Sequence, residues 1–220
     1  DFRLFARGRE RRFGWALGQS MYTPADIEAP VPDPADRPYA GWLFASLGVA
    51  SRHEDRLDVL ELDVGVVGPS ASAVETQIFV HKLSDARSPN GWRHQLRDEP
   101  GVLLSYQRKW RRKLEGLPPG LDLDVMPHLG GDVDNVLTQA LAGATLRVGF
   151  HLPKDFGPLR TGLSPTVASY YEPVPNLAYY LFAGIEGRAV LRNIFLDGNS
   201  FRDGPSVDKR WLVGELHYGI

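Results

Sequence analysis

The sequence predicts an all-β fold, a transmembrane antiparallel up-and-down β-barrel. Two-residue alternation of apolar and polar side chains dominates the chain, and this is the pattern of strands with two different faces. Most predicted strands are about 10 residues or longer, which suits the crossing of a bilayer better than a globular sheet. Short turns alternate with long connections, as periplasmic turns alternate with outer loops in such barrels.

Nine segments have this strand character. In the clearest of them Leu146 and Phe150 alternate with Thr145 and Arg147. The strands are expected at residues 1–7, 13–21, 39–53, 56–67, 101–114, 121–130, 138–150, 178–191 and 210–220. Single-chain bacterial barrels have an even number of strands, so an odd number indicates that strands are missing. We therefore treat residues 1–220 as a single outer-membrane barrel domain, incomplete at both termini.

The connections and one irregular strand carry further expectations. Short turns are expected at 8–12, 54–55 and 115–120, and long connections at 22–38, 68–100 and 192–209. Residues 151–177 do not fit this scheme, because they are long and Pro-rich yet fall on the short-turn side. The alternation also slips at Val59-Leu60, which predicts a β-bulge or two strand faces there.

Aromatic and basic residues gather near the predicted strand ends. The aromatic ones are Tyr39, Trp42, Phe44, Trp110, Tyr179, Tyr180, Trp211 and Tyr218. They are interpreted as girdles at the membrane surface, although aromatic residues also simply favour strands. The basic run from Arg108 to Lys113 precedes a short turn and is interpreted as a solvated strand end, in preference to a site for an anionic ligand.

The composition excludes several classes of protein. A net charge of −2 without a basic patch argues against nucleic-acid binding. The absence of cysteine excludes disulfides, thiol catalysis and zinc–cysteine sites. No apolar run reaches about 18 residues, which excludes a membrane-spanning helix. A serine-nucleophile lipase is disfavoured because the sequence has no Gly-x-Ser-x-Gly elbow.

One connection predicts a short helix, near residues 71–84, with Ser70 or Ser72 as its cap. In it Gln77 and His81 are four residues apart and share one face. An imidazole can take a proton from water and return it to a leaving alcohol. A glutamine amide can donate to a carbonyl oxygen that gains charge. The pair is sufficient for part of an ester hydrolysis, although such pairs are also common as surface residues.

Several motifs, taken in order, resemble those of the outer-membrane lipid A 3'-O-deacylase family. They are Gly18-Gln19-Ser20-Met21-Tyr22-Thr23-Pro24, Asp36-Arg37-Pro38-Tyr39-Ala40-Gly41-Trp42, Leu62-Asp63-Val64-Gly65-Val66-Val67-Gly68-Pro69, Gln77-Ile78-Phe79-Val80-His81, Gly91-Trp92 with Gln95-Leu96, and Phe195-Leu196-Asp197-Gly198-Asn199. The resemblance covers essentially the whole chain, and its motifs are specific in combination.

The resemblance implies a twelve-stranded barrel, of which about nine strands are present, with a site between the outer wall and the loop helix. It implies a carboxylic ester hydrolase of the bacterial outer membrane that removes an acyl chain from lipid A of lipopolysaccharide, with its active site facing the outer leaflet. By position, His81 would activate water, Gln77 would position water or His81, and Ca²⁺ would polarise the ester carbonyl.

The family's calcium ligands lie on its first strand, and this chain begins at what looks like the second. We therefore expect no metal ligand within the chain, whose ligands would precede Asp1, and we expect the chain alone to be inactive. Arg37, Trp92 and Gln95 are candidate substrate-binding residues. Asp36-Arg37 either forms an ion pair that holds its loop or contacts a lipid A phosphate. Trp92 and Gln95 either support the helix or line the lipid groove.

The sequence also contains two other candidate sites and leaves rival functions open. His128 shares a polar strand face with two carboxylates, which predicts a lumen position and not a metal site. Asp132-Val133-Asp134-Asn135 predicts a tight turn and not a calcium loop. The rival functions are a passive or porin-like barrel, a soluble ligand-binding barrel and an outer-membrane phospholipase. We expect a monomer whose partners are lipid A and the membrane, with no nucleic acid.

Overall fold

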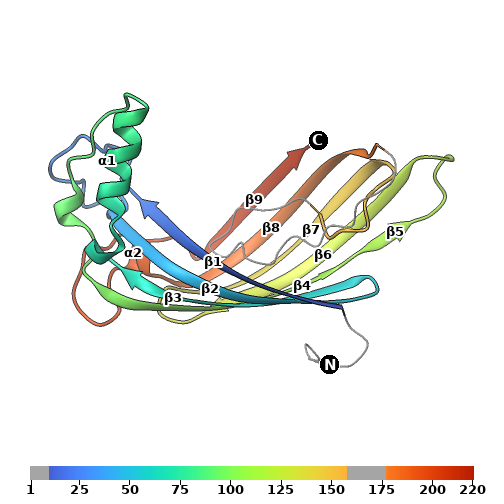
Figure 1. The fold of residues 1–220 in the computed structure, drawn as a ribbon, viewed down its shortest axis with the longest axis horizontal. Coiled ribbons are helices and arrows are strands. Elements are labelled where there is room, and N and C mark those ends of the chain that lie inside the picture. The colour runs from blue at the N-terminus through green and yellow to red at the C-terminus, as the bar shows by residue number, and fades with distance from the viewer. Residues whose placement is uncertain (1–9, 158–176) are drawn as a thin grey trace.

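The computed structural model describes residues 10–157 and 177–220, which form one antiparallel sheet ordered β1-β2-β3-β4-β6-β7-β8-β9, with β5 pairing β6 (Figure 1). The strands are β1 (Glu10–Tyr22), β2 (Ala40–His53), β3 (Arg56–Val67), β4 (Glu99–Trp110), β5 (Arg112–Leu114), β6 (Asp122–Val133), β7 (Leu137–Phe150), β8 (Tyr179–Asn193) and β9 (Leu212–Gly219). The helices are α1 (Ala73–Leu83) and α2 (Ile194–Asp197), with single 3₁₀ turns at Pro69–Ala71 and Trp92–His94. The predicted up-and-down order is confirmed.

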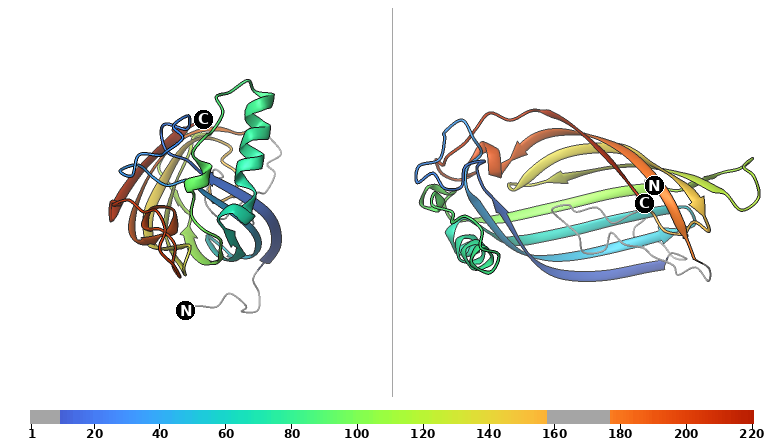
Figure 2. Two further views of the ribbon diagram at one scale, coloured as in Figure 1. Left: turned by 90° about the vertical axis from the view of Figure 1, so that its left-hand side faces the viewer. Right: turned by 90° about the horizontal axis from the view of Figure 1, so that it is seen from above.

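The sheet is curved, and α1 stands at one end of its strands (Figures 1 and 2). We call this the α1 end, and the opposite end, which holds the turn between β2 and β3, the turn end. Three of the long connections lie at the α1 end, where the strands β1, β3 and β8 finish. Within the described residues, no helix has the length and apolar character needed to cross a membrane.

Within the described residues the strand predictions hold with two differences. Residues 10–12 belong to β1, so the turn predicted at 8–12 is wrong for these positions. The strand predicted at 101–114 is interrupted at Arg111, whose backbone N–H donates to Asp55 O at 2.7 Å, and it continues as the short β5. The strand predicted at 1–7 lies outside the described residues. The tight turn predicted at 132–135 is confirmed between β6 and β7.

The slip at Val59-Leu60 has no bulge behind it, because β3 keeps an unbroken register with both β2 and β4. The two faces of β3 instead exchange polarity along the strand. At the turn end Leu57 and Val59 point inward and pack with Phe156, while Asp58 on the other face is held in ion pairs. The predicted bulge is therefore wrong, and the alternative of two strand faces fits.

The outward face of the sheet is apolar and its inward face is polar. Trp15, Leu47, Leu62 and Leu104 lie side by side in the sheet register, and the first two are 73% and 66% exposed. On the inward face the buried polar residues include Ser46, Glu61, Asp63, Asp124, His128, Thr145, Arg147 and Glu186. Apolar groups outside and charges inside suit a strand whose outer side faces lipid. A soluble barrel would have a polar outer face.

Ion pairs and hydrogen bonds between strands neutralise the buried charges. The guanidinium of Arg147 donates to Asp124 at 3.0 and 2.8 Å and also to Asp155, and none of its side chain is exposed. His128 Nε2 lies 2.8 Å from Glu186 Oε2, which confirms the predicted lumen position of this histidine. Asp155 follows β7, so the described start of the 151–177 segment turns inward onto the sheet.

The basic run is a solvated strand end only in its last two residues, Arg112 and Lys113, which are exposed. Three of its members pair with carboxylates of neighbouring strands, in the pairs Arg108–Asp58 at 2.6 Å, Arg111–Asp124 at 2.8 Å and Lys113–Asp122 at 2.6 Å. For Arg108 and Arg111, which are mainly buried, the prediction is wrong, because carboxylates of β3 and β6 meet them on the two faces of the sheet.

An apolar cluster fills the inside of the sheet at the α1 end, and we call it the rim core. It comprises Ala40, Trp42, Phe44, Val67, Leu96, Leu103, Val136, Leu137, Val190, Ile194 and Phe195, with Tyr22 packed against them. The rings of Tyr22 and Phe195 stack with centroids 4.0 Å apart and so join β1 to α2. Trp42 and Phe44 therefore do not form a surface girdle, and Tyr39 is fully buried as well, whereas Trp211 and Tyr218 are exposed.

Replacing Arg147 with Ala should lower the free energy of unfolding by about 3–5 kcal/mol, because buried Asp155 would lose the cation it pairs with and Asp124 would keep only Arg111. Urea-induced unfolding in detergent micelles measures this loss. Arg202→Ala, an exposed position, is the control and should change the value by less than about 0.5 kcal/mol. Equal stability of the two variants would contradict the assigned role of the network.

Candidate functional site

The helix α1 starts directly against β2, and glycine permits this approach. Gly68 ends β3 with a φ of 110°, and its N–H donates to Gly41 O at 2.9 Å. A Cβ on Gly41 would lie 2.7 Å from Ala73 Cβ and 3.0 Å from Ala71 Cβ. Gln19 on β1 adds a 2.6 Å hydrogen bond from Nε2 to Ala71 O. The first residues of α1 are therefore fixed to the ends of two strands.

The helix confirms the prediction near residues 71–84, but its start differs from the expected one. Ser72 occupies the N-cap position with a left-handed backbone, φ 53°, and its side chain makes no capping hydrogen bond. Ser70 does not cap either, because its N–H and its hydroxyl donate to the Asp98 carboxylate at 2.7 and 2.9 Å. Asp98, the residue before β4, thus holds the turn that precedes α1.

Gln77 lies on the inner side of α1 and is buried. Its Oε1 accepts a hydrogen bond of 2.6 Å from Trp92 Nε1. The Trp92 ring packs against Tyr39, with ring centroids 4.9 Å apart, and against Ala73. The indole N–H can only donate, so it fixes which end of the amide is oxygen. The carbonyl of Gln77 is engaged by Trp92, and its NH₂ group remains as a donor.

His81 lies one turn further along α1 and is half-buried. Its Nδ1 lies 2.5 Å from the backbone carbonyl oxygen of Arg87. A carbonyl oxygen only accepts, so this hydrogen bond requires the proton on Nδ1. Nε2 of the neutral ring then carries the lone pair. An imidazole held in this way presents a base at Nε2.

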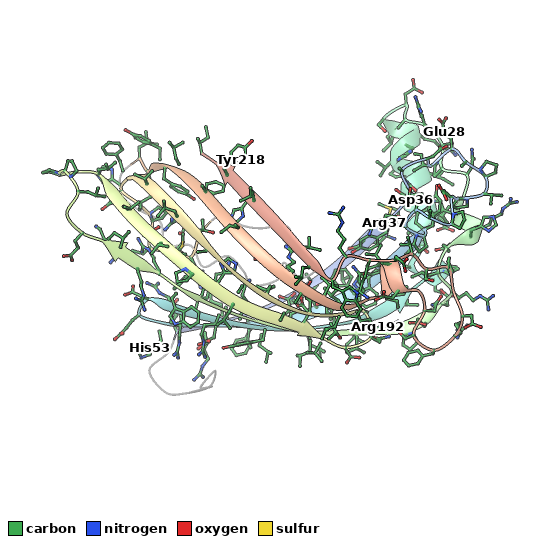
Figure 3. The ribbon with its side chains drawn as sticks, turned by 180° about the vertical axis from the view of Figure 1, so that it is seen from behind. Glu28, Asp36, Arg37, His53, Arg192 and Tyr218 are labelled. Carbon is green, nitrogen blue, oxygen red and sulfur yellow. The ribbon has the colours of Figure 1, made fainter. Side chains whose placement is uncertain are left out.

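Residues 87–90 are held in turn by the connection between β1 and β2. Asn90 N–H donates to Ile27 O at 2.8 Å, and Asn90 Nδ2 donates to Glu28 O at 3.1 Å. An ion pair of 3.0 Å joins Arg87 to Glu28, but both side chains are more than half exposed, so the pair adds little. Figure 3 shows Glu28 beside α1. The hydrogen bonds of Asn90 are therefore what places the Arg87 carbonyl.

Tyr39 also holds the connection between β1 and β2. Its hydroxyl donates to Ile27 O at 3.0 Å, and burial raises the pKa of this phenol. A Cβ on Gly91 would lie 2.5 Å from the Tyr39 ring, which leaves room only for glycine before Trp92. One buried aromatic side chain thus contacts both the residue that orients Gln77 and the loop next to His81.

Four apolar side chains of α1 are exposed, beside the exposed charges of Glu75 and Lys82. Ile78, Phe79, Val80 and Leu83 have exposed fractions between 36% and 73%. No other described element covers them. Exposed apolar residues on a rim helix suit contact with lipid, which is the medium that the outer face of the sheet also requires.

The other candidate residues lie apart from this pair. The Arg37 guanidinium carbon sits 4.9 Å from the centroid of the Tyr22 ring, and its Nε is buried without a hydrogen-bond partner. Asp36 accepts hydrogen bonds of 2.6 Å from the N–H groups of Ala25 and Arg37. It holds its loop through the backbone and not through the predicted ion pair (Figure 3). Gln95 is half-buried, with Oε1 unpartnered.

The sequence matches a known protein family over almost its whole length. The family described as Outer membrane protein LpxR matches residues 2–220. The chain belongs to this family. Among solved structures, "LpxR from Salmonella typhimurium" matches with a TM-score of 0.80 at 24% sequence identity, covering 95% of this chain and 71% of that chain. This likeness confirms the predicted all-β barrel fold, and the family confirms the outer-membrane assignment. A search of curated proteins finds no match.

The family motif Phe195–Asn199 has a structural explanation at the α1 end. Asn193 caps α2 by accepting from Phe195 N–H at 3.0 Å. Asn199 exchanges hydrogen bonds of 3.0 and 2.8 Å with the backbone of Arg97. Buried Glu99 accepts from Ser200 N–H at 3.0 Å. The motif therefore binds the β8–β9 connection to the start of β4, beneath α1.

The resemblance also implies calcium, and the described residues do not supply a site for it. Among them, no three His, Asp or Glu side chains come together as metal ligands would. Near α1, the carboxylates of Asp36 and Asp98 are already engaged by backbone N–H groups. A calcium site in this protein therefore stays a prediction.

Replacing Gly41 with Ala should loosen α1, because the added methyl group collides with Ala71 and Ala73. Hydrogen–deuterium exchange in residues 73–83 should become about 5- to 150-fold faster, as overpacking of about 1–3 kcal/mol requires. Gly214→Ala is the matched control, since a Cβ there meets nothing within 4 Å. Equal exchange in both variants would contradict the proposed attachment of α1.

Proposed function

We propose that this protein is a lipid A deacylase, which hydrolyses an ester-linked acyl chain at a site carried by α1. Membership of the Outer membrane protein LpxR family supports the reaction class. The observation that carries the proposal is the paired orientation of Gln77 and His81, each fixed by its own hydrogen bond. A surface helix without a function would not need either bond.

In the proposed mechanism His81 Nε2 takes a proton from water, which attacks the acyl carbonyl carbon. The NH₂ group of Gln77 donates to the carbonyl oxygen as negative charge develops on it, because its own carbonyl is held by Trp92. His81 then returns the proton to the departing sugar hydroxyl. The Arg87 carbonyl stabilises the imidazolium formed between these two steps.

The exposed apolar surface of α1 supports a lipid substrate. Phe79 and Leu83 lie on the helix that carries His81, so acyl chains of a lipid can contact the same element as the base. We propose that α1 faces the outer leaflet, where lipid A resides. Arg37, with its unpartnered Nε, is a proposed contact for a lipid A phosphate. Gln95 remains a proposed substrate contact, whereas Trp92 acts through Gln77.

A porin-like function is disfavoured by the inside of the sheet. The rim core fills its α1 end with Trp42, Phe44 and Phe195, all buried. Below this cluster, the Arg147 and His128 networks join the neighbouring strands β6, β7 and β8 along the inner surface. A polar channel requires an open, solvated lumen, and the described residues do not leave one at the rim.

Replacing His81 with Ala in the protein expressed from its complete gene should reduce fatty-acid release from lipid A by at least about 100-fold, as loss of a general base does. Mass spectrometry of lipid A extracted from the membrane measures the product. His53→Ala, at the turn end, is the control and should retain activity. Undiminished deacylation by His81→Ala would contradict the assignment. Release from glycerophospholipid but not from lipid A would show a phospholipase instead.

Replacing Trp92 with Phe should lower kcat about tenfold and change KM little, because the Gln77 amide loses its orientation but the lipid contacts remain. Steady-state assays on purified protein with lipid A in mixed micelles separate the two constants. In the Gln77→Ala background the same substitution should have almost no further effect. An additive loss in the double variant would show that Trp92 acts independently of Gln77.

A further inference from the structure

A polar cluster interrupts the lipid-facing surface near the turn end. The outward row formed by Leu47, Leu62 and Leu104 is apolar, as is Leu60 in the next row. One further step along the strands, the outward position of β3 is Asp58, and its register partner on β4 is Arg108. The cluster comprises Arg56, Asp58, Tyr106, Arg108 and Trp110, and we call it the outer basic cluster.

The carboxylate of Asp58 is the centre of the outer basic cluster. It lies 2.6 Å from Arg108 Nε and 3.2 Å from Arg56 Nε, and Tyr106 donates its hydroxyl proton to it at 2.7 Å. The side chain of Asp58 is only 2% exposed, whereas those of Arg56 and Arg108 are 25% and 18% exposed. Among the described residues, two guanidinium groups therefore face this carboxylate, and both are more exposed than it.

The aromatic residues of the cluster complete a headgroup-binding environment. The Arg108 guanidinium carbon lies 5.9 Å from the ring centroids of both Tyr106 and Trp110. Tyrosine and tryptophan favour the boundary between acyl chains and headgroups. On the β2–β3 side only the turn of Glu54 and Asp55 lies beyond the row of Arg56 and Trp110, while β4 continues past Arg111 into the short β5. The outer basic cluster is thus at the level of the lipid phosphates.

We propose that the outer basic cluster binds the phosphate of an anionic glycerophospholipid in the leaflet at the turn end. The free N–H edges of Arg56 and Arg108 would donate to the phosphate oxygens, as guanidinium groups do. The surplus positive charge left by Asp58 selects an anionic headgroup over a zwitterionic one. The acyl chains would lie along Leu60, Leu62 and Leu104. Figure 3 shows His53, which neighbours Arg56 across the β2–β3 turn, far from Glu28 and α1.

This site is separate from the proposed hydrolytic site. No residue of the outer basic cluster contacts α1 or the connections that hold His81 within the described residues. The proposal rests on the outer-membrane assignment and not on deacylase activity. Failure of one proposal therefore leaves the other standing.

Quenching of Trp110 fluorescence by brominated lipids tests the proposal. The protein, expressed from its complete gene, is placed in vesicles of phosphatidylcholine with brominated phosphatidylglycerol or brominated phosphatidylcholine. The difference between wild type and Trp110→Phe isolates the signal of Trp110. We expect phosphatidylglycerol to associate about fivefold more strongly than phosphatidylcholine, because the surplus positive charge attracts a headgroup of net negative charge, whereas both lipids offer the same phosphate oxygens.

Arg108→Gln should reduce this preference to about that of the vesicle average, and Arg202→Gln, at an exposed outer-loop position, should leave it unchanged. Arg56→Gln tests the same cation pair if Arg108→Gln fails to insert. Circular dichroism confirms that each variant is folded. Equal quenching by both lipids in wild type would overturn the proposal, and so would an unchanged preference in both cluster variants.

Discussion

Over most of its length, each described strand presents an apolar side to lipid and a polar side to the interior of the sheet, and the rest of the structure depends on this division. Charges that lie on the inner side are removed from water, and each requires a partner on a neighbouring strand. Arg147 meets Asp124 and Asp155, and His128 meets Glu186. These pairs join β6, β7 and β8 to one another. The inner network is therefore a consequence of the outer medium.

The same division leaves the strand ends as the place for chemistry. The α1 end closes over the rim core, in which Tyr22 on β1 stacks on Phe195 of α2. On this closed base, Gly41 lets α1 stand against β2, Trp92 binds Gln77, and the Arg87 carbonyl binds His81. The proposed base and its neighbouring amide are thus attached to a rigid sheet through a few short contacts. Preorganisation of this kind is what a hydrolytic site needs.

Parts of this arrangement could be predicted from the sequence because one physical rule governs them. The alternation of Leu146 and Phe150 with Thr145 and Arg147 follows from lipid on one side only, and β7 has that division. The positions of Gln77 and His81 on one helix follow from helical spacing, and the family motifs added their roles. Their catalytic roles stay a prediction. The local rule fails where a strand changes environment, as at Val59, whose inward side chain meets Phe156 from a distant segment.

Other parts could not be predicted because they depend on contacts distant in the sequence. Trp42 and Phe44 were expected at the membrane surface, but α2 covers them from about 150 residues further along the chain. The Arg87 carbonyl is a backbone group, so no side-chain pattern in the sequence points to its contact with His81. Asn90, in the same segment, is bound to the Glu28 carbonyl, 62 residues earlier in the chain. The sequence allows an ion pair between Asp36 and Arg37, but the Asp36 carboxylate instead accepts hydrogen bonds from the backbone N–H groups of Ala25 and Arg37.

The central claim is that the Arg87 carbonyl holds the proton on Nδ1 of His81 and leaves Nε2 as the base. Nitrogen NMR of ¹⁵N-histidine-labelled protein in micelles measures the tautomer directly, with the His81 signals assigned from their loss in His81→Asn. At a pH at which the ring is neutral, the account predicts a protonated Nδ1 and an unprotonated Nε2. A protonated Nε2 with an unprotonated Nδ1 would contradict it.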